Sequence, residues 1–287
     1  MMGKILDGKA CSAQIRAALA SEIKTIISKV ERPPCLAVIW VGENPASATY
    51  VKAKGKACEK IGMDFQLHHL PETVTEKELI ALIHSLNKNH NVDALLVQLP
   101  LPKQISEESV VSAISPEKDA DGFHPYNLGR LIMGNPTFIP CTPAGILELL
   151  HKNEIDTTGK EVVIVGRSNI VGKPLAVLLM QKALGNATVT VCHTATRDLV
   201  FHTKRADILI VAAGRPRMIK ADMVKEGGVV VDVGIHRTEQ GLCGDVDFEE
   251  VEPKTFAITP VPGGVGPMTV AMLLKNTVLA WKGRYKV

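Results

Sequence analysis

Several features that would assign the chain to a special class of protein are missing from its sequence. No apolar run approaches the roughly 18 residues that a membrane-spanning helix needs. The first residues lack the apolar core of a signal peptide, so nothing points to secretion. Neither sign of charge dominates, because 33 Lys and Arg stand against 30 Asp and Glu, a net charge of +3. We therefore expect neither a membrane nor a nucleic acid as partner.

The six cysteines show no metal-binding or redox spacing, since no two of them form a C-x-x-C pair. They are Cys11, Cys35, Cys58, Cys141, Cys192 and Cys243. Most lie within apolar stretches, which favours buried, reduced thiols. We therefore expect a cytoplasmic protein without a bound metal.

What is present is typical of a globular protein. Hydrophobic residues make up 46% of the chain and charged residues 22%, so a sizeable core can be buried. A length of 287 residues corresponds to about two domains. Composition thus excludes disordered, fibrous and secreted disulfide-rich classes without indicating an activity.

The hydrophobic pattern divides the chain into two series of alternating strands and helices. In the first series it predicts helices over 8–30, 45–61 and 75–89 and strands over 36–41, 64–70 and 93–97. In the second it predicts strands over 162–165, 188–191, 208–211, 229–231 and 256–258, helices over 143–153 and 174–184, and a last helix after Pro267. A loose segment rich in Asp, Gly and Pro, 115–136, separates them, and we expect a hinge near 115–140. The alternation indicates an α/β fold of two units with parallel sheets.

A glycine-rich segment, 166–174 (GRSNIVGKP), connects the strand over 162–165 to a helix. Backbone amides and a helix N-terminus in such a turn can meet an anionic group. The segment is not a P-loop, because five residues separate its glycines and Pro174 stands at the hydroxyl position. It also departs from G-x-G-x-x-G, because Ser168 replaces the second glycine. The residues alone leave open a cofactor loop and a tight structural turn.

The end of the next strand favours NADP over NAD. NAD-binding units usually place a carboxylate there for the ribose hydroxyl, but here none occurs before Asp198. Arg167, Thr194 and Arg197 could instead offer donors and positive charge to a 2′-phosphate. Arg197 could equally be a solvated loop charge.

One lysine lies on the apolar face of the helix predicted over 45–61. At about 100° per residue, Lys54 falls in the same arc as Tyr50, Ala57, Cys58 and Ile61. It could extend its amine from that face into water. Alternatively it is a partly desolvated lysine, biased toward the neutral amine and suited to proton transfer beside an aromatic ring.

Three further segments could form a site. Gln98 is a polar residue where the strand over 93–97 ends, and ligands bind at the carboxyl ends of parallel strands. Asp119 and Asp121 precede Gly122, a pattern typical of a turn and less often of a metal or substrate site. The rigid, glycine-rich turn over 260–269 could hold backbone close to a ligand.

Taken together, five segments resemble the bifunctional methylenetetrahydrofolate dehydrogenase/methenyltetrahydrofolate cyclohydrolase family. They are 50–54 (YVKAK), 97–102 (VQLPLP), 118–122 (KDADG), 166–174 (GRSNIVGKP) and 260–269 (PVPGGVGPMT). The resemblance covers nearly the whole chain. It implies oxidation of 5,10-methylenetetrahydrofolate with NADP as cofactor, followed by hydrolysis of the methenyl product to 10-formyltetrahydrofolate.

The resemblance also implies an architecture. It is an N-terminal three-layer α/β catalytic domain that binds folate, a Rossmann-like NADP-binding domain, and a cleft between them. We expect the folate-binding domain over 1–140, completed by the last helix over 267–287, and the NADP-binding domain over 141–266. It further implies a homodimer through the second domain.

Roles for individual residues follow from the same resemblance. Lys54 would transfer protons in the hydrolytic step, with Gln98 hydrogen-bonded to it, Tyr50 stacking near the aminobenzoate ring and Asp121 holding the pterin. Further folate contacts would come from Val97, Leu99, Pro262, Gly263, Gly264, Val265 and Gly266. The cofactor contacts would be Gly166, Arg167, Ser168, Thr194 and Ile235. Relatives that use NADP often have serine where this chain has Thr194, which keeps the hydroxyl and adds a methyl group.

Two alternatives remain at this point. One is another two-domain NADP-dependent dehydrogenase, of the shikimate or amino-acid type, without cyclohydrolase activity. The other is a catalytically silent scaffold that binds NADP or folate.

Overall fold

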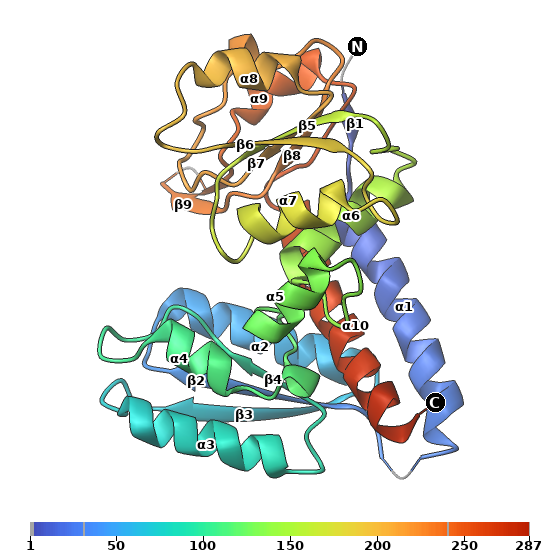
Figure 1. Ribbon diagram of the computed structural model, residues 1–287, viewed down its shortest axis with the longest axis vertical. Coiled ribbons are helices and arrows are strands. Elements are labelled where there is room, and N and C mark those ends of the chain that lie inside the picture. Colours follow the sequence, from blue (N-terminus) through green and yellow to red (C-terminus); the bar gives the residue numbers. More distant parts are fainter. Residues whose placement is uncertain (1–2, 31, 240, 287) are drawn as a thin grey trace. The chain divides into compact units, whose positions relative to one another are not determined.

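The computed structural model describes residues 3–30, 32–239 and 241–286, and these form two compact units (Figure 1). Unit 1 comprises Met1–Ala13, Leu131–Asn135 and Pro140–Thr269, and unit 2 comprises Gln14–Arg130, Pro136–Ile139 and Val270–Val287. Each unit contains its own parallel sheet, as the strand–helix alternation predicted. No helix among the described residues has the length and apolar character to cross a membrane.

Unit 2 is built on a three-stranded sheet in the order β3-β2-β4. Its strands are β2 (Cys35–Val41), β3 (Asp64–Leu70) and β4 (Ala94–Val97), and all pair in parallel. The connecting helices are α2 (Pro45–Lys60), α3 (Glu76–Lys88) and α4 (Glu107–Ala113). At the carboxyl ends of β2 and β4 the chain continues into residues 42–45 and 98–102.

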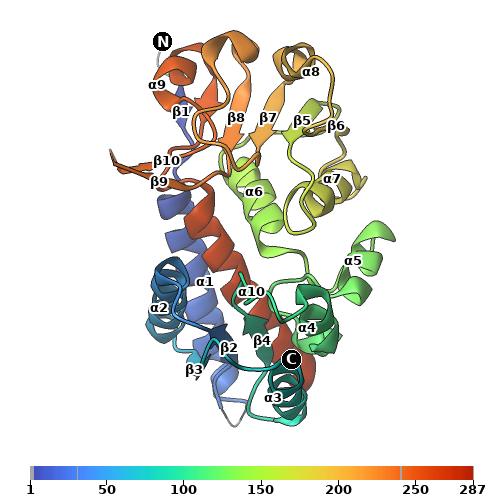
Figure 2. The same cartoon turned by 90° about the vertical axis from the view of Figure 1, so that its left-hand side faces the viewer.

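Helices cover both faces of this sheet, because side chains alternate between the faces along each strand (Figure 2). Ala37 and Ile39 pack with Leu79 and other apolar residues of α3 in one buried cluster. On the other face Gly55 of α2 approaches the ring of Phe65 so closely that a Cβ would lie 3.0 Å from it. The result is the three-layer arrangement expected for this part of the chain.

Unit 1 has a six-stranded parallel sheet in the order β1-β11-β8-β7-β5-β6. Its strands are β1 (Lys4–Ile5), β5 (Glu161–Val165), β6 (Thr188–Cys192), β7 (Ile208–Val211), β8 (Val229–Asp232) and β11 (Ala257–Ile258). The central strands are buried on both faces, which explains their unbroken apolar runs. β6 lies on one side of β5 and β7 on the other, so the strand order reverses at β5, as in a Rossmann-like unit.

Shorter elements complete unit 1. The helices are α6 (Cys141–Lys152), α7 (Gly172–Met180), α8 (Leu199–Arg205) and α9 (Phe248–Val251), with 3-10 turns η2 (Ala221–Met223) and η3 (Glu252–Lys254). Strands β9 (His236–Thr238) and β10 (Gly241–Cys243) form a separate antiparallel hairpin.

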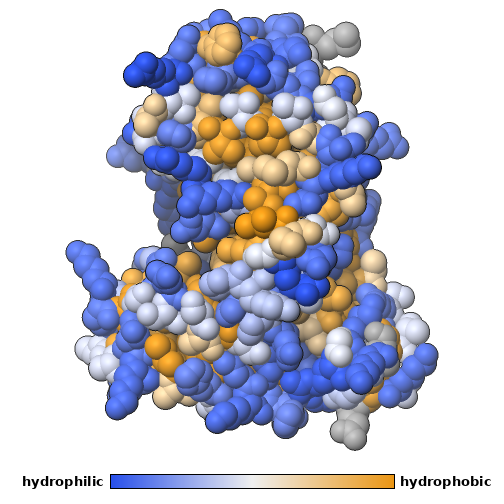
Figure 3. All heavy atoms as spheres, in the orientation of Figure 1, coloured by the Kyte–Doolittle hydropathy of each residue, from blue (hydrophilic) through white to orange (hydrophobic). Residues whose placement is uncertain are grey.

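Apolar side chains gather on one face over α7, whose last residue, Met180, is 55% exposed (Figure 3).

Two long helices contribute residues to both units. They are α1 (Gly8–Ile27) and α10 (Val265–Tyr285). Within unit 2, Asn276 of α10 donates to the backbone oxygens of Ala120 and Ile139, and Trp281 is fully buried. The predicted last helix therefore does pack on unit 2 over its second half; Val287, the last residue of the expected range, lies outside the described residues.

The long predicted elements are confirmed, and the differences concern ends and short pieces. The helix predicted to end at 184 ends at Met180, because the backbone oxygen of Gln181 accepts from the amides of 184–186 and the chain turns back. The helix predicted over 8–30 ends at Ile27. The segment 115–136, expected to be loose, contains a 3-10 turn, η1 (Pro116–Lys118), and a helix, α5 (Pro125–Ile132).

The start of the chain departs from the expected division at 140. The two-residue strand β1 pairs with β11, so residues 4–13 belong to unit 1 and not to the unit that follows them in sequence. The partner of β1 is about 250 positions away in the sequence. The hydrophobic pattern near residues 4–5 therefore could not predict this pairing.

Candidate active site

In unit 2, Lys54 and Gln98 form a direct hydrogen bond. Lys54 is half-buried on α2, and its Nζ donates to Oε1 of Gln98 at 3.0 Å. Gln98 follows β4, where its backbone amide donates to Ile39 and its Nε2 donates to the oxygen of Leu99 at 2.7 Å. Because that carbonyl can only accept, the amide group is fixed with its oxygen toward Lys54. The lysine is therefore held inside the site and does not simply extend into water.

Asp119 and Asp121 have different environments although they are two residues apart. Asp119 is buried, and its carboxylate accepts from the amides of Gly122, Phe123 and His124 and from Nδ2 of Asn127. It is therefore the residue that organises the turn. Burial raises the pKa of Asp121 from 3.8 to about 6, while the nearby charge of Lys54 lowers it and that of Asp119 raises it. A second titratable group thus lies within electrostatic reach of Lys54.

The strand end beside these groups is apolar. Val97, Leu99 and Asp121 line a small pocket of about 20 Å³, together with Leu95, Leu96, Val110, Val111, Ile114, Asp119 and Phe123. Tyr50 lies one helical turn before Lys54 on α2 and is 45% exposed, so its ring is free to meet a ligand. The structure thus brings the unit 2 residues of the predicted site to the carboxyl end of β4 and the facing side of α2.

In unit 1, a pocket of about 370 Å³ opens at the carboxyl ends of β5, β6 and β7. Four of the predicted cofactor residues line it: Gly166, Arg167, Ser168 and Thr194. It lies where the strand order reverses, which is where open α/β sheets bind their ligands. The glycine-rich segment is therefore part of a pocket and not only a tight turn.

The glycines of this segment are required by close approach of the backbone. Gly166 has φ +128°, and a Cβ there would lie 2.2 Å from the oxygen of Ala212. A Cβ on Gly172 would lie 2.1 Å from the oxygen of Gly166. Ser168, at the position of the missing second glycine, accepts from the amides of Val171 and Gly172 through its hydroxyl. The serine thus satisfies amides at the start of α7 that the helix leaves free.

The same pocket contains residues that the sequence did not single out. They are Val165, His193, Thr196, Leu199, Ala212, Ala213, Arg215 and Met218. Arg197 is exposed and is not among the described residues that line the pocket, whereas Arg215 is. The loop after β7 reaches the pocket only through the tertiary fold. Nothing in the local sequence of this loop indicated that it would contact a ligand.

The turn 262–266 lies in unit 1, next to the start of α1. The oxygen of Gly263 accepts from the amide of Lys9, and a Cβ on Gly8 would lie 1.8 Å from the oxygen of Gly264. A Cβ on Gly266 would lie 3.5 Å from the side chain of Ile235, which is 44% exposed. Ile235 and the turn are therefore neighbours.

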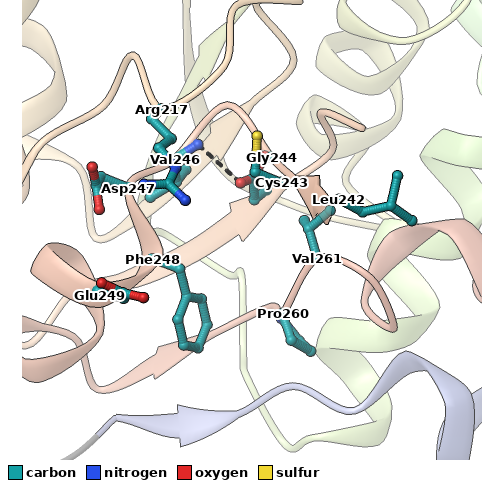
Figure 4. A pocket seen from close by; sticks show the side chains of 11 residues that line it. Arg217, Leu242, Cys243, Gly244, Val246, Asp247, Phe248, Glu249, Pro260 and Val261 are labelled. Atoms are coloured by element: carbon teal, nitrogen blue, oxygen red, sulfur yellow. Dashed lines mark hydrogen bonds between the residues drawn. The ribbon is translucent and has the colours of Figure 1, made fainter. Parts of the chain in front are cut away.

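A second pocket of unit 1, of about 240 Å³, is lined by Pro260 and Val261 from the start of the predicted turn 260–269 but by none of the residues to which a role was assigned (Figure 4). Its lining is mixed, with Arg217, Asp247 and Glu249 beside Leu242 and Phe248. Among the described residues, no group of three or more His, Cys, Asp or Glu side chains is placed to hold a metal ion.

Comparison with known proteins relates these clusters to one family. The model described as "Tetrahydrofolate dehydrogenase/cyclohydrolase, catalytic domain" matches residues 6–121, and "Tetrahydrofolate dehydrogenase/cyclohydrolase, NAD(P)-binding domain" matches residues 140–285. "Bifunctional protein FolD" of Bacillus licheniformis is 55% identical over 283 residues, which are 98% of each chain.

Solved structures agree with this match. The bifunctional enzyme FolD, methylenetetrahydrofolate dehydrogenase/cyclohydrolase, of Campylobacter jejuni superposes with a TM-score of 0.95 at 53% identity, covering 98% of this chain and 99% of the other. The N5,N10-methylenetetrahydrofolate dehydrogenase-cyclohydrolase of Trypanosoma brucei, complexed with NADP cofactor and inhibitor, gives 0.95 at 37% identity and covers 100% of both chains. The predicted family is confirmed: the chain belongs to the tetrahydrofolate dehydrogenase/cyclohydrolase family.

Proposed function

We propose that the chain oxidises 5,10-methylenetetrahydrofolate to 5,10-methenyltetrahydrofolate with NADP and then hydrolyses the product to 10-formyltetrahydrofolate, two steps of one-carbon metabolism. The observation that carries the proposal is the bond between Lys54 and Gln98 beside Asp121, in a chain whose other unit holds a glycine-lined pocket at its strand-order reversal. Folate is assigned to unit 2 and NADP to unit 1.

In the hydrolytic step, Lys54 is the group that moves the proton. Water attacks the electron-poor methenyl carbon, and the attacking oxygen must lose a proton as the bond forms. The Nζ of Lys54 takes that proton and delivers it to the ring nitrogen when the ring C–N bond opens, while the second proton of the water leaves to solvent as the carbonyl forms. Gln98 holds the amine at 3.0 Å and so fixes its position on the strand end.

The remaining residues of unit 2 orient the substrate. The carboxylate of Asp121 accepts from the pterin, Tyr50 stacks near the aminobenzoate ring, and Val97 and Leu99 provide an apolar wall. In this proposal the turn 262–266 contacts the folate as well.

In the oxidative step, NADP supplies the hydride acceptor, so the chain has only to bind and orient. Gly166 and Ser168 bring backbone close to the dinucleotide, and Ile235 lies against it. Arg167 and Thr194 are assigned to the 2′-phosphate, where a guanidinium makes charge-assisted hydrogen bonds.

A dehydrogenase of the shikimate or amino-acid type is the less favoured alternative, because it leaves the Lys54–Gln98 pair without a task. One measurement, the reduction of NADP in the presence of methylenetetrahydrofolate, separates the proposed enzyme from both this alternative and a silent scaffold. No reduction by the wild-type chain would refute the proposed function.

Lys54→Ala tests the hydrolytic assignment. Because the proton-transferring amine is lost, we expect cyclohydrolase activity to fall by about 100-fold or more. The measurement is the decay of methenyltetrahydrofolate absorbance, and Lys56→Ala is the matched control, since Lys56 is an exposed lysine on the same helix. Unaltered hydrolysis by Lys54→Ala would remove Lys54 from the mechanism.

Arg167→Ala tests the choice of cofactor. Loss of a charge-assisted contact to the 2′-phosphate should raise the KM for NADP by about 10-fold or more and leave that for NAD within about twofold. Equal losses with both cofactors would refute the role of Arg167.

We further propose a homodimer through unit 1, in the cytoplasm. The hairpin of β9 and β10 forms a sheet of its own, and Leu242 on it is 43% exposed. All six cysteines lie among the described residues and none forms a disulfide, as expected in a reducing compartment. Sedimentation as a monomer at micromolar concentration would contradict the dimer.

A further inference from the structure

We infer that Asp245 is a positioning residue for the dehydrogenase: its buried carboxylate holds the loop 213–215, two of whose residues line the cofactor pocket, and the segment that carries Ile235. This inference rests on the proposed function, since it assigns Asp245 to NADP binding through other residues. Asp245 lies in no motif singled out by the sequence.

The first link is to the loop after β7. Oδ2 of Asp245 accepts from the amide of Ala213 at 2.6 Å and from that of Gly214 at 3.0 Å. Oδ1 accepts from the amide of Arg215 at 2.9 Å. Three successive amides therefore converge on one carboxylate and form a nest around it. Because Ala213 and Arg215 line the cofactor pocket, the carboxylate fixes one of its walls.

The second link is to the segment after β8. Nε2 of His236 lies 2.7 Å from Oδ1 of Asp245, and because a carboxylate only accepts, the ring donates. His236 directly follows Ile235, the residue assigned to the cofactor. One carboxylate thus binds two segments that are about 20 positions apart in sequence, one that lines the cofactor pocket and one that carries the residue assigned to the cofactor.

Asp245 has no freedom to move away from these partners. Its side chain is fully buried, and a Cβ on Gly234 would lie 2.4 Å from its carboxyl carbon. Its backbone amide donates to Asp232 at 2.9 Å, and its backbone oxygen accepts from Ile219 at 3.0 Å. Because these contacts hold the carboxylate of Asp245 in place, the carboxylate in turn fixes the loop 213–215.

A neighbouring aspartate supplies the contrast. Asp247 is also buried, but its carboxylate pairs with Lys220 at 2.6 Å and lines the second pocket of unit 1. If buried acids in this turn acted only on stability, the two would behave alike. If Asp245 positions the cofactor loop, only its replacement changes NADP binding.

The test compares Asp245→Asn and Asp247→Asn with the wild type. Asparagine keeps the shape of the side chain but has one acceptor oxygen, so some of the four donors would face an NH₂ group. For Asp245→Asn we expect the Kd and KM for NADP to rise by about 10-fold or more, with kcat of the cyclohydrolase and KM for methylenetetrahydrofolate within about twofold of wild type. For Asp247→Asn all four values should stay near those of the wild type.

Direct titration with NADP separates this inference from the proposed function, because binding is measured whether or not the wild type turns over folate. Unchanged NADP affinity in Asp245→Asn would overturn the inference, and so would a parallel loss of both activities in a variant that is folded by circular dichroism. If Asp245→Asn does not fold, His236→Phe decides. It removes one donor and keeps an aromatic ring, so a threefold or larger rise, roughly, in the KM for NADP supports the inference and no change overturns it.

Discussion

At the scale of single residues, two aspartates with the same sequence signal have different tasks. Asp119 satisfies four donors and builds the turn, whereas the carboxyl group of Asp121 is left with a pKa of about 6 beside Lys54. The pattern of two acids before Gly122 predicted a turn or a site; the turn is confirmed for Asp119, and the site role of Asp121 stays a prediction. Sequence could not distinguish them, because their difference lies in which amides the folded turn presents.

The raised pKa of Asp121 makes a prediction about stability. The folded state binds the proton more tightly than the unfolded state, with pKa values of about 6 and 3.8. The stability contributed by this group is therefore complete below pH 3.8 and is lost as the pH rises through 6. Relative to wild type, Asp121→Asn should gain about 1 kcal/mol in the free energy of unfolding between pH 5 and pH 8.

Urea unfolding at the two pH values measures this gain. Asp64→Asn, which replaces an exposed carboxylate of the same unit and keeps Asp121, is the control: its free energy of unfolding relative to wild type should change little between pH 5 and pH 8. A loss of stability by Asp121→Asn relative to wild type on going from pH 5 to pH 8 would contradict the sign of the shift.

At the scale of elements, the turn between β5 and α7 explains why the segment departs from the common dinucleotide fingerprint. Gly166 and Gly172 are fixed by the close approach of backbone, whereas the position between them tolerates a side chain. Ser168 uses that freedom to satisfy the first amides of α7. Glycine is thus present where the backbone approaches closely, at Gly166 and Gly172, although Gly172 lies one residue beyond the third glycine of the fingerprint.

Gly166→Ala should weaken NADP binding without abolishing hydrolysis. The added Cβ would lie 2.2 Å from the oxygen of Ala212, so the turn must move away from the pocket. We expect the Kd for NADP, measured by titration, to rise by about 10-fold or more while cyclohydrolase activity persists.

Gly159→Ala is the matched control for this change. Gly159 also has a positive φ, +68°, but nothing lies within 4 Å of its added Cβ. That variant has the backbone strain, about 1 kcal/mol, without the collision, so its NADP affinity should match that of the wild type. Equal losses in the two variants would show that strain alone, and not the approach to Ala212, sets the requirement.

The elements that sequence predicted are those with a long hydrophobic period, and the elements that it missed are short. α8 has seven residues, and the carboxylate of Asp198 caps its start, while Thr203 is its buried residue. β1 has two residues and exists only through its pairing with β11. In the same way, Lys54, Gln98 and Gly166 could be found from local pattern, but Ala213 and Arg215 could not, because only the folded sheet brings them to the pocket.

At the scale of the whole molecule, covalent continuity joins the two units. α1 and α10 each supply residues to both units. Unfolding of either helix within one unit therefore also disrupts helical turns that continue into the other unit. Both tryptophans, Trp40 and Trp281, belong to unit 2, where Trp40 stacks on His69 and Trp281 is fully buried. Tryptophan fluorescence therefore reports on unit 2 alone.

This arrangement predicts that NADP, which is assigned to unit 1, stabilises unit 2 against urea, as measured by tryptophan fluorescence. A ligand at 100 times its Kd stabilises the folded state by about 2.7 kcal/mol, which corresponds to roughly 1 M urea. We expect the urea midpoint of the fluorescence change to rise by that amount with NADP present, because the shared helices make unfolding a single transition.

The control is Arg167→Ala at the same NADP concentration, which should show a much smaller shift. If the fluorescence midpoint stays in place while NADP raises the midpoint of the far-UV circular dichroism, the two units unfold separately.

The pairing of Lys4 with Ala257 and Ile5 with Ile258 also governs when the protein can fold during its synthesis. At about 5–20 residues per second, roughly 10 to 50 s separate the emergence of the two strands from the ribosome. Throughout that interval the first strand has no partner and the edge that will receive it does not exist. A strand of only two residues offers little surface for mistaken pairing, so its shortness protects the nascent chain. β1 is thus synthesised about 250 residues before the strand with which it pairs.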